Sequence, residues 1–206
     1  MFMKFGCWTA AAVMAMGLVS VSSANAQMNA CNGGKGMAMA PGDAAGKSFD
    51  DLLSLQEKNI VGTAEAMPAD KFDFAPSQAI FSPSQKVDFS SPKPVATFAE
   101  MVKHLAQANY YFFGSKTMKP QVDVKAIKSL KSKDEIIAAL KASFAYAHMT
   151  VSSMTTSTGF VENENEGEKS TLAATYAFGL MHMNDHYGQL NEYLRMNGIV
   201  PPASRK

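Results

Sequence analysis

Two of the chain's four histidines stand four residues apart, in the segment His182-Met-Asn-Asp-His186. On a helix this spacing places both imidazoles on one face, near enough to bind the same metal ion. His104 lies within another predicted helix and, like the other two, on the flank of that helix's apolar stripe. Three imidazoles that point into a cleft between helices would suit Zn²⁺, Ni²⁺ or Fe²⁺, with water completing the shell. Spacing alone also leaves open purely structural histidines.

The fourth histidine and the acidic residues offer no further catalytic group. His148 falls within an apolar stripe, so we expect a hydrogen-bonded core histidine rather than a fourth ligand. No glutamate stands between His182 and His186, which excludes the zinc-protease arrangement His-Glu-x-x-His. Glu192 faces away by helical rotation. The catalytic residues therefore stay unassigned, and nothing supports a serine or cysteine nucleophile.

Other polar residues lie close to the histidines in sequence or rotation. Asp185 and Asn184 could orient an imidazole from behind, although an ordinary solvated role competes with this hypothesis. Gln189, Tyr193 and Tyr111 sit near the histidine flanks, where they could line a cleft or simply pack.

Four amphipathic helices must position these residues. They are predicted over residues 48–67, 97–115, 132–157 and 170–197 from apolar residues repeating at helical spacing. Three begin with a hydroxyl residue followed three positions later by an acid, the pattern of a capping box: Ser48 with Asp51, Thr97 with Glu100, and Ser132 with Glu135. Asn197-Gly198, followed by Pro201-Pro202, ends the last helix.

The connections favour an all-α four-helix bundle with a long first crossover connection. Residues 68–96 contain five prolines and no helical period, whereas the links at 116–131 and 158–169 are shorter. No alternating β pattern competes seriously, and the last link is polar and rich in acidic residues.

The N-terminus has the pattern of a signal peptide over residues 1–26. A short basic start and an apolar stretch precede Ala24-Asn-Ala26, the small-residue ending that signal peptidase cleaves. We therefore expect an exported protein, periplasmic or extracellular, with no stable membrane span after cleavage. A flexible leader at 27–47, containing Cys31 and several methionines, would precede the domain at 48–204.

Composition bounds the function further. The 206 residues carry 19 basic and 18 acidic side chains, and 47% of residues are hydrophobic, as in a globular protein. A net charge of +1 argues against a nucleic-acid partner. Cleavage would remove Cys7 and leave Cys31 alone, so no internal disulfide is expected.

The C-terminal segment from His182 to Ser204 resembles the end of the DinB-like superfamily. The matching features are the histidine pair, the following Tyr-Gly-Gln, then Tyr-Leu-Arg and a Gly-x-x-Pro-Pro ending. The stretch Phe98–Tyr110 is similar to the family's second helix, which carries the first histidine, and Ala64–Pro76 to its usual exit from helix one. The resemblance covers residues 48–204.

This resemblance implies a four-helix bundle that holds one divalent metal ion through His104, His182 and His186. Members are often dimers, so a homodimer is expected, and some are metal-dependent transferases that act with low-molecular-weight thiols. The longer first link and the export signal depart from the family pattern, and thiol cofactors belong mainly to the reducing cytoplasm. A transferase or hydrolase of unknown small-molecule substrate therefore competes with a non-catalytic metal-binding or small-ligand-binding envelope protein, and with a structural bundle that lacks metal.

Overall fold

The computed structural model describes residues 43–80, 84–86, 88–90, 94–114, 119–165 and 168–206. The chain divides into two units, Met1–Ala38 and Met39–Lys206, and all described residues belong to the second. The predicted signal peptide, Cys31 and the leader up to residue 42 lie outside the described residues.

Helix α1 spans Asp43–Ala66, so it begins five residues before the predicted start at Ser48. Residues 43–47, which we assigned to the leader, are therefore helical. The Ser48 hydroxyl does not cap the helix; it donates to the carbonyl of Ala44 at 2.7 Å, one turn back. The capping-box prediction was wrong here because a serine inside a helix satisfies its hydroxyl with the backbone of the preceding turn.

The other two predicted capping boxes are confirmed. Helix α2, Phe98–Phe112, begins where the Thr97 hydroxyl accepts from the Glu100 amide and the Glu100 carboxylate accepts from the Thr97 amide. Helix α3, Lys133–Ser152, begins with the same reciprocal pair between Ser132 and Glu135. Each box satisfies two backbone N–H groups that the first helical turn leaves free.

A β-hairpin precedes the last long helix, in a link that we predicted to be irregular. Strand β1, Glu162–Asn165, pairs antiparallel with β2, Glu168–Thr171, with Glu162 opposite Thr171. The short helix α4, Thr156–Gly159, comes just before it. Thr171 ends β2 and also caps helix α5, Leu172–Met196, by accepting from the Ala174 amide. The strand therefore fixes where α5 starts.

The predicted end of α5 is confirmed. Asn197 is the C-cap, and Gly198 adopts a φ of 73°, the left-handed conformation that closes many helices. The amide of Ile199 then donates to the Leu194 carbonyl at 3.0 Å, and that of Gly198 to Arg195 at 2.9 Å, which completes a Schellman motif.

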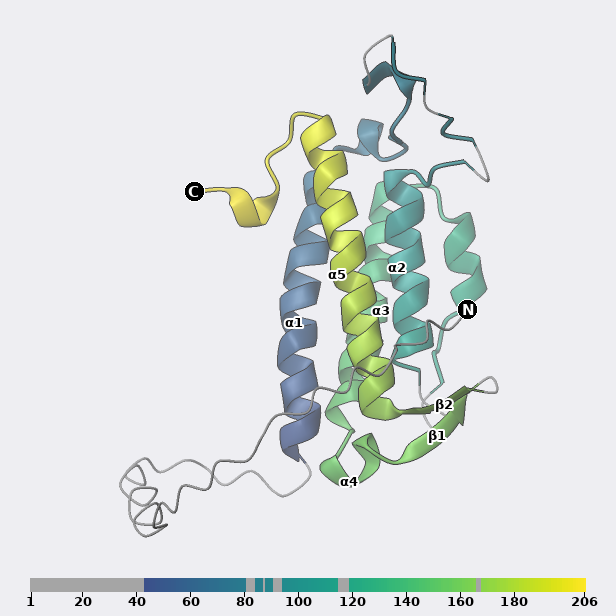
Figure 1. Cartoon of the computed structure of the whole chain (residues 1–206), viewed down its shortest axis with the longest axis vertical. Helices are drawn as coiled ribbons and strands as arrows, with labels where there is room; N and C mark the ends of the chain where they lie inside the picture. The colour runs from purple at the N-terminus through teal and green to yellow at the C-terminus, as the bar shows by residue number, and fades with distance from the viewer. Residues whose placement is uncertain (1–42, 81–83, 87, 91–93, 115–118, 166–167) are drawn as a thin grey trace, which may run out of the picture. The chain divides into compact units, whose positions relative to one another are not determined.

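The four long helices form a bundle in which α1 and α2 each pack against α3 and α5 (Figure 1). Helices α1 and α5 run in the same direction, because Phe49 contacts Tyr176 at one end and Thr63 bonds Asn191 at the other. Helices α1 and α2 lie on a diagonal, as expected for a crossover connection rather than for simple neighbours. Short 3₁₀ turns occupy the connections and the C-terminus, at Ala69–Lys71, Gln78–Ile80, Val124–Ser129 and Pro202–Ser204.

The core lies along the bundle axis and receives large apolar side chains from all four long helices. Fully buried members include Leu53, Phe98, Leu105, Phe144 and Met183. Two hydrogen bonds between buried side chains cross this core: Thr63 to Asn191 at 3.2 Å, and Asn109 to Ser143 at 3.0 Å. Among the described residues, no helix is long and apolar enough to cross a membrane.

Candidate metal centre

The contact between α2 and α5 brings the three predicted histidines together. Gly179 makes this contact close: a Cβ atom added there would lie 2.9 Å from the Cβ of Phe112 and 2.9 Å from the ring of Phe113. One turn further along α5, His182 faces His104 of α2. Gly179 could not be predicted as part of this contact from the sequence, because only the packing of α2 shows why a side chain is excluded there.

The three imidazoles converge on one point. The Nε2 atoms of His104 and His182 lie 3.0 Å apart, and their ring centroids are separated by 5.0 Å. The His186 ring lies 4.9 Å from that of His104 and 4.5 Å from that of His182. One nitrogen from each ring lies within 4.8 Å of the corresponding nitrogens of the other two. The structure therefore brings together all three predicted ligands, while metal binding itself stays a prediction.

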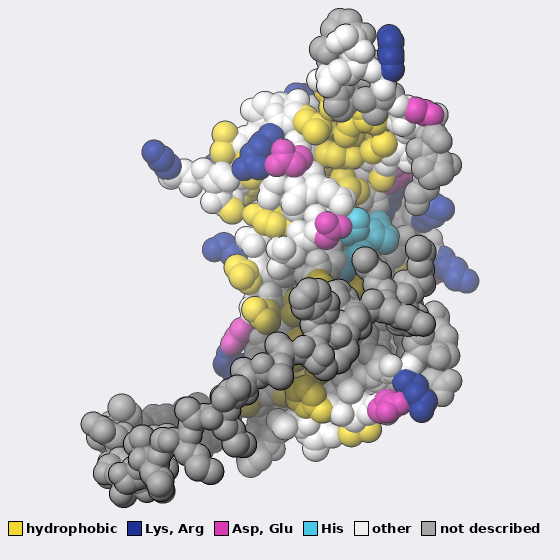
Figure 2. Space-filling view, in the orientation of Figure 1, with side chains coloured by type: hydrophobic (Ala, Val, Ile, Leu, Met, Phe, Trp, Pro, Cys, Tyr) yellow, Lys and Arg dark blue, Asp and Glu magenta, His cyan; other side chains and the backbone are white. Residues whose placement is uncertain are grey.

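This spacing suits a single ion. Two imidazole nitrogens bound tetrahedrally to one zinc, at bonds of about 2.0–2.1 Å, would lie about 3.3 Å apart. The 3.0 Å between His104 and His182 is close to that value, and the largest nitrogen separation of 4.8 Å requires only a small inward movement of one ring. Figure 2 shows histidine side chains gathered at one place on the surface of this face. The group is thus reachable from solvent.

Burial and the neighbouring imidazoles keep His182 neutral. Desolvation, followed by the charges of His186 and His104, lowers the pKa of His182 from 6.5 to about 4, against an opposing effect of Asp185. A metal ligand must be a deprotonated imidazole. His182 is therefore in the binding form at neutral pH. Its buried Nδ1 has no hydrogen-bond partner among the described residues.

His186 differs from His182 because hydrogen bonds orient its ring. Its Nδ1 lies 3.0 Å from Oε1 of Gln189, and Nε2 of Gln189 donates to the Asp185 carboxylate at 3.1 Å. We suggested that Asp185 or Asn184 could orient an imidazole from behind; in the structure the hydrogen bond of Asp185 goes to Gln189, which in turn contacts the His186 ring.

Aromatic rings adjoin the histidines on one side. The Phe112 ring lies 5.1 Å from that of His182 and 5.3 Å from that of Phe178. Phe178 is 56% exposed, and Tyr111, which contacts Phe112 at 5.1 Å, is also exposed. We placed Tyr111 near the histidine flank, but the two phenylalanines were not identified from the sequence. Phe112 has the helical spacing of a core residue but is only partly buried, and the packing of α2 against α5 is what brings the exposed Phe178 beside it.

His148 lies outside this group, on α3. It is only partly buried, and its two ring nitrogens contact carboxylates of α1: Nδ1 to Asp50 at 2.6 Å and Nε2 to Glu57 at 3.1 Å. Both ring nitrogens have hydrogen-bond partners, as expected, but these are carboxylates at the α1–α3 contact rather than groups within the apolar core. The metal-capable group does not include it.

Two further candidates have structural contacts elsewhere. The hydroxyl of Tyr193 donates to the carbonyl of Ala96 at 3.1 Å, which ties α5 to the residues before α2. Glu192 pairs with Arg195 at 3.0 Å on the exposed face of α5. Neither residue therefore contacts the three histidines, and the acidic side chain near them is Asp185, which is bonded to Gln189.

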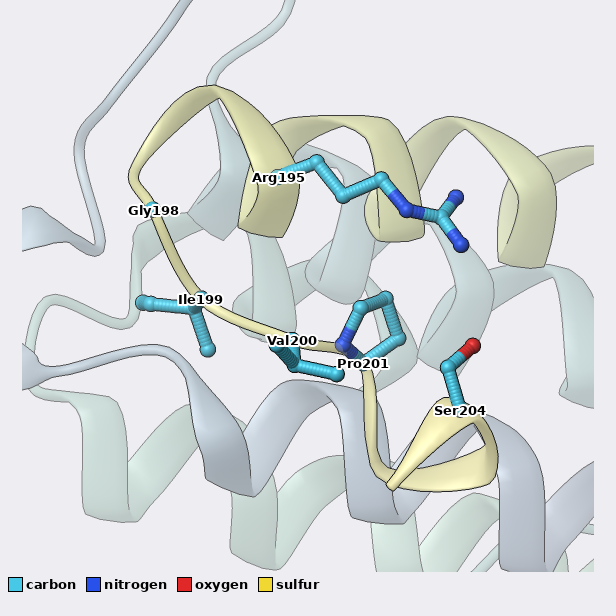
Figure 3. Close-up of a pocket in the computed structure, with 6 residues that line it drawn as sticks. All are labelled: Arg195, Gly198, Ile199, Val200, Pro201 and Ser204. Carbon is cyan, nitrogen blue, oxygen red and sulfur yellow. The ribbon is translucent and has the colours of Figure 1, made fainter. Parts of the chain in front are cut away.

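A small surface pocket of about 210 Å³ lies at the C-terminal end of α5 (Figure 3). Arg195 and the turn after the helix line it, together with Gly198, Ile199, Val200, Pro201 and Ser204. Arg195 follows His186 by nine residues, roughly 13 Å along a helix that rises 1.5 Å per residue. This pocket is therefore separate from the histidine group.

Comparison with known proteins identifies a family that the chain matches and a solved structure with a similar fold. The family model described as the DinB superfamily matches residues 52–190, more than half of the chain. A crystal structure of a DinB-like protein from Bacillus cereus ATCC 10987 superposes with a TM-score of 0.61 at 13% identity, covering 76% of this chain and 95% of that one. None of the curated proteins compared matches the chain.

Proposed function

The chain belongs to the DinB superfamily, and from this premise we propose that it binds one divalent metal ion through His104, His182 and His186. The observation that carries the proposal is the convergence of one nitrogen from each ring within 4.8 Å. Because His104 comes from α2 and the other two from α5, the ion would also link these two helices.

Three imidazoles suit Zn²⁺, Ni²⁺ or Fe²⁺ and leave at least one coordination position for water or substrate. Bound there, such an ion would activate a water molecule or a substrate thiol for attack on an electrophile. The protein's own part is to hold the three imidazole rings in place and to keep their outer side accessible. We therefore propose a metal-dependent transferase or hydrolase, acting on a small molecule that can reach the exposed face.

The aromatic side chains next to the histidines support a small-molecule ligand. Phe112 contacts the His182 ring, and Phe178 extends this surface outward. A ligand bound at the open coordination position would contact these rings, and burying their apolar area would stabilise the complex by roughly 25 cal/mol per Å².

We also propose that the protein acts outside the cytoplasm. Support comes from the basic start, the apolar stretch and the Ala24-Asn-Ala26 ending of residues 1–26. Release of the chain into the periplasm or medium, with a mature N-terminus near Gln27, would test this; a cell fraction holding only uncleaved chain would contradict it.

Metal content measured on untagged protein tests the central proposal. We expect about one equivalent of a divalent ion in the wild type and almost none in His182→Ala/His186→Ala. His148→Gln provides the matched control, because it removes a histidine that lies outside the group, and it should retain its metal. A wild type that stays empty, and that gains no thermal stability from added Zn²⁺, Ni²⁺ or Fe²⁺, would overturn the proposal.

Metal content alone does not distinguish an enzyme from a non-catalytic binding protein. Turnover of thiol or ester substrates by the loaded wild type, lost in His182→Ala with the fold intact, would establish catalysis. Tight metal retention without exchange of an outer ligand would instead identify a binding protein.

A further inference from the structure

We propose that Gln189 and Asp185 are positioning residues that fix the His186 ring with its Nε2 atom free to bind the metal ion. The bonds Asp185–Gln189–His186 are called the α5 relay below. This proposal rests on the proposed metal binding. It explains what orients one of the three ligands, His186.

The α5 relay follows from helical spacing. Gln189 stands three residues after His186 and four after Asp185, so all three side chains meet on one face of α5. The distances are 3.0 Å between His186 Nδ1 and Gln189 Oε1, and 3.1 Å between Gln189 Nε2 and Asp185 Oδ2. Both are within the range of good hydrogen bonds.

The direction of the hydrogen bonds follows from the chemistry of the three groups. An ionised carboxylate only accepts, so the group of Gln189 that faces Asp185 must be its NH₂. The amide oxygen of Gln189 then faces His186, and because an amide oxygen only accepts, the Nδ1 of His186 must carry the hydrogen. A neutral imidazole has a single N–H, so Nε2 keeps its lone pair for the ion. Asp185 thereby favours the Nδ1–H tautomer of His186 through Gln189, without contacting the ring itself.

The ring of His182 lacks such a restraint. Its Nδ1 is buried without a hydrogen-bond partner among the described residues, and the Phe112 ring packs beside it. The two histidines of α5 are therefore held differently: His182 by burial, packing and the contact of its Nε2 atom with His104, and His186 by the hydrogen bond of its Nδ1 atom to Gln189. Partners behind a metal ligand commonly change metal affinity 10–100-fold when they are removed.

Nuclear magnetic resonance of the ring nitrogens tests the relay without any metal. In chelator-treated protein at neutral pH, we expect long-range ¹H–¹⁵N correlations to show His186 with its hydrogen on Nδ1. Gln189→Leu should shift the ring toward the Nε2–H form, whereas Glu192→Leu, at another exposed position of α5, should leave it unchanged. A His186 ring that is already mainly Nε2–H in the wild type, or that is unaffected by Gln189→Leu, would overturn the proposal.

Metal affinity supplies the second readout. With Co²⁺ as the probe, Gln189→Leu should raise the Kd by about 10-fold or more and alter the visible spectrum of the bound ion. The double variant Asp185→Asn/Gln189→Glu keeps an acceptor toward the His186 ring and a hydrogen bond between positions 185 and 189, with the donor moved to position 185, so it should restore most of the affinity. Unchanged Co²⁺ affinity in Gln189→Leu would overturn the proposal, and circular dichroism and melting temperature would establish that each variant folds.

A double-mutant cycle separates the relay from simple charge attraction. If Asp185 acts through Gln189, Asp185→Ala should weaken Co²⁺ binding in the wild type but have little effect in Gln189→Leu. An equal effect in both backgrounds would mean that the carboxylate attracts the ion directly, and would overturn its positioning role. Failure of the wild type to bind Co²⁺ would refute the proposed function, while the tautomer measurement would still decide on the relay.

Discussion

The Nε2 atoms of His104 and His182, from two different helices, lie 3.0 Å apart. Two neutral imidazoles can approach this closely only when one of them carries the hydrogen on Nε2 and donates it to the other. A metal ion that binds both nitrogens would replace this single bond by two stronger ones. Metal binding and the packing of α2 against α5 are therefore coupled.

This coupling predicts thermal stabilisation by metal. Binding to the folded chain alone stabilises it by about 2.7 kcal/mol at a free ion concentration of 100 times the Kd. We expect Zn²⁺ to raise the melting temperature of the wild type progressively, and His104→Ala to lose the effect because α2 supplies no other ligand. His148→Gln should respond like the wild type. The same rise in His104→Ala would contradict the three-histidine site.

The low pKa of His182 predicts a specific pH dependence for the metal-free protein. The folded-state pKa is about 4 and the ordinary value is 6.5, so between these pH values the unfolded chain binds a proton that the folded chain does not. The free energy of unfolding should therefore be unaffected by His182 above pH 6.5 and fall as the pH is lowered to about 4.

Urea unfolding with a chelator, measured from pH 7.5 to pH 4, would test this. We expect His182→Gln to lose less stability over this window than the wild type does. Identical slopes for both proteins would contradict the assigned pKa, as would a His182 ring that titrates near 6.5 by nuclear magnetic resonance.

Substitution by alanine should have opposite effects on protein stability at two glycines of α5. An added Cβ at Gly188 meets nothing within 4 Å, so Gly188→Ala should stabilise the helix by about 1 kcal/mol. At Gly179 the Cβ would lie 2.9 Å from Phe112 and from the buried Phe113 ring. Overpacking costs about 1–3 kcal/mol, which outweighs the gain in helix propensity, so Gly179→Ala should destabilise the protein by about 1 kcal/mol.

Gly179→Ala should also weaken metal binding, because separating α5 from α2 moves His182 away from His104. Chemical denaturation and Co²⁺ titration of both glycine variants would check these expectations. Equal stability changes at the two positions would show that α2 and α5 are not in close contact at Gly179.

Local chemistry explains which parts of the fold were predictable. The boxes at Thr97 and Ser132 are formed by side chains and backbone within four residues, so the sequence carries all the information needed. Ser48 shows the same pattern but lies inside a helix that begins earlier, at Asp43. The hairpin at 162–171 was missed because its strands are polar and form through their pairing with each other rather than through an apolar face.

The three candidate ligands could be selected from the sequence, but the contacts around them could not. Helical rotation and the family resemblance selected His104, His182 and His186, and their convergence follows from α2 packing against α5. The closeness of that packing depends on the absence of a side chain at Gly179, and the Gln189 bonds depend on rotamers. A sequence pattern records neither of these three-dimensional relationships.

Two adjacent aspartates of α1 provide a last prediction. Asp50 contacts His148 across the α1–α3 interface, with the aspartate side chain 31% exposed, whereas Asp51 pairs with Lys47 on the surface and is 64% exposed. A partly buried hydrogen bond to a charged group contributes about 1 kcal/mol after allowance for solvent, and an exposed pair on one helix about 0.3–0.5 kcal/mol. We therefore expect Asp50→Asn to lower the free energy of unfolding clearly more than Asp51→Asn, with metal affinity unchanged in both. Equal losses in urea unfolding would mean that the contact with His148 contributes nothing to holding α1 against α3.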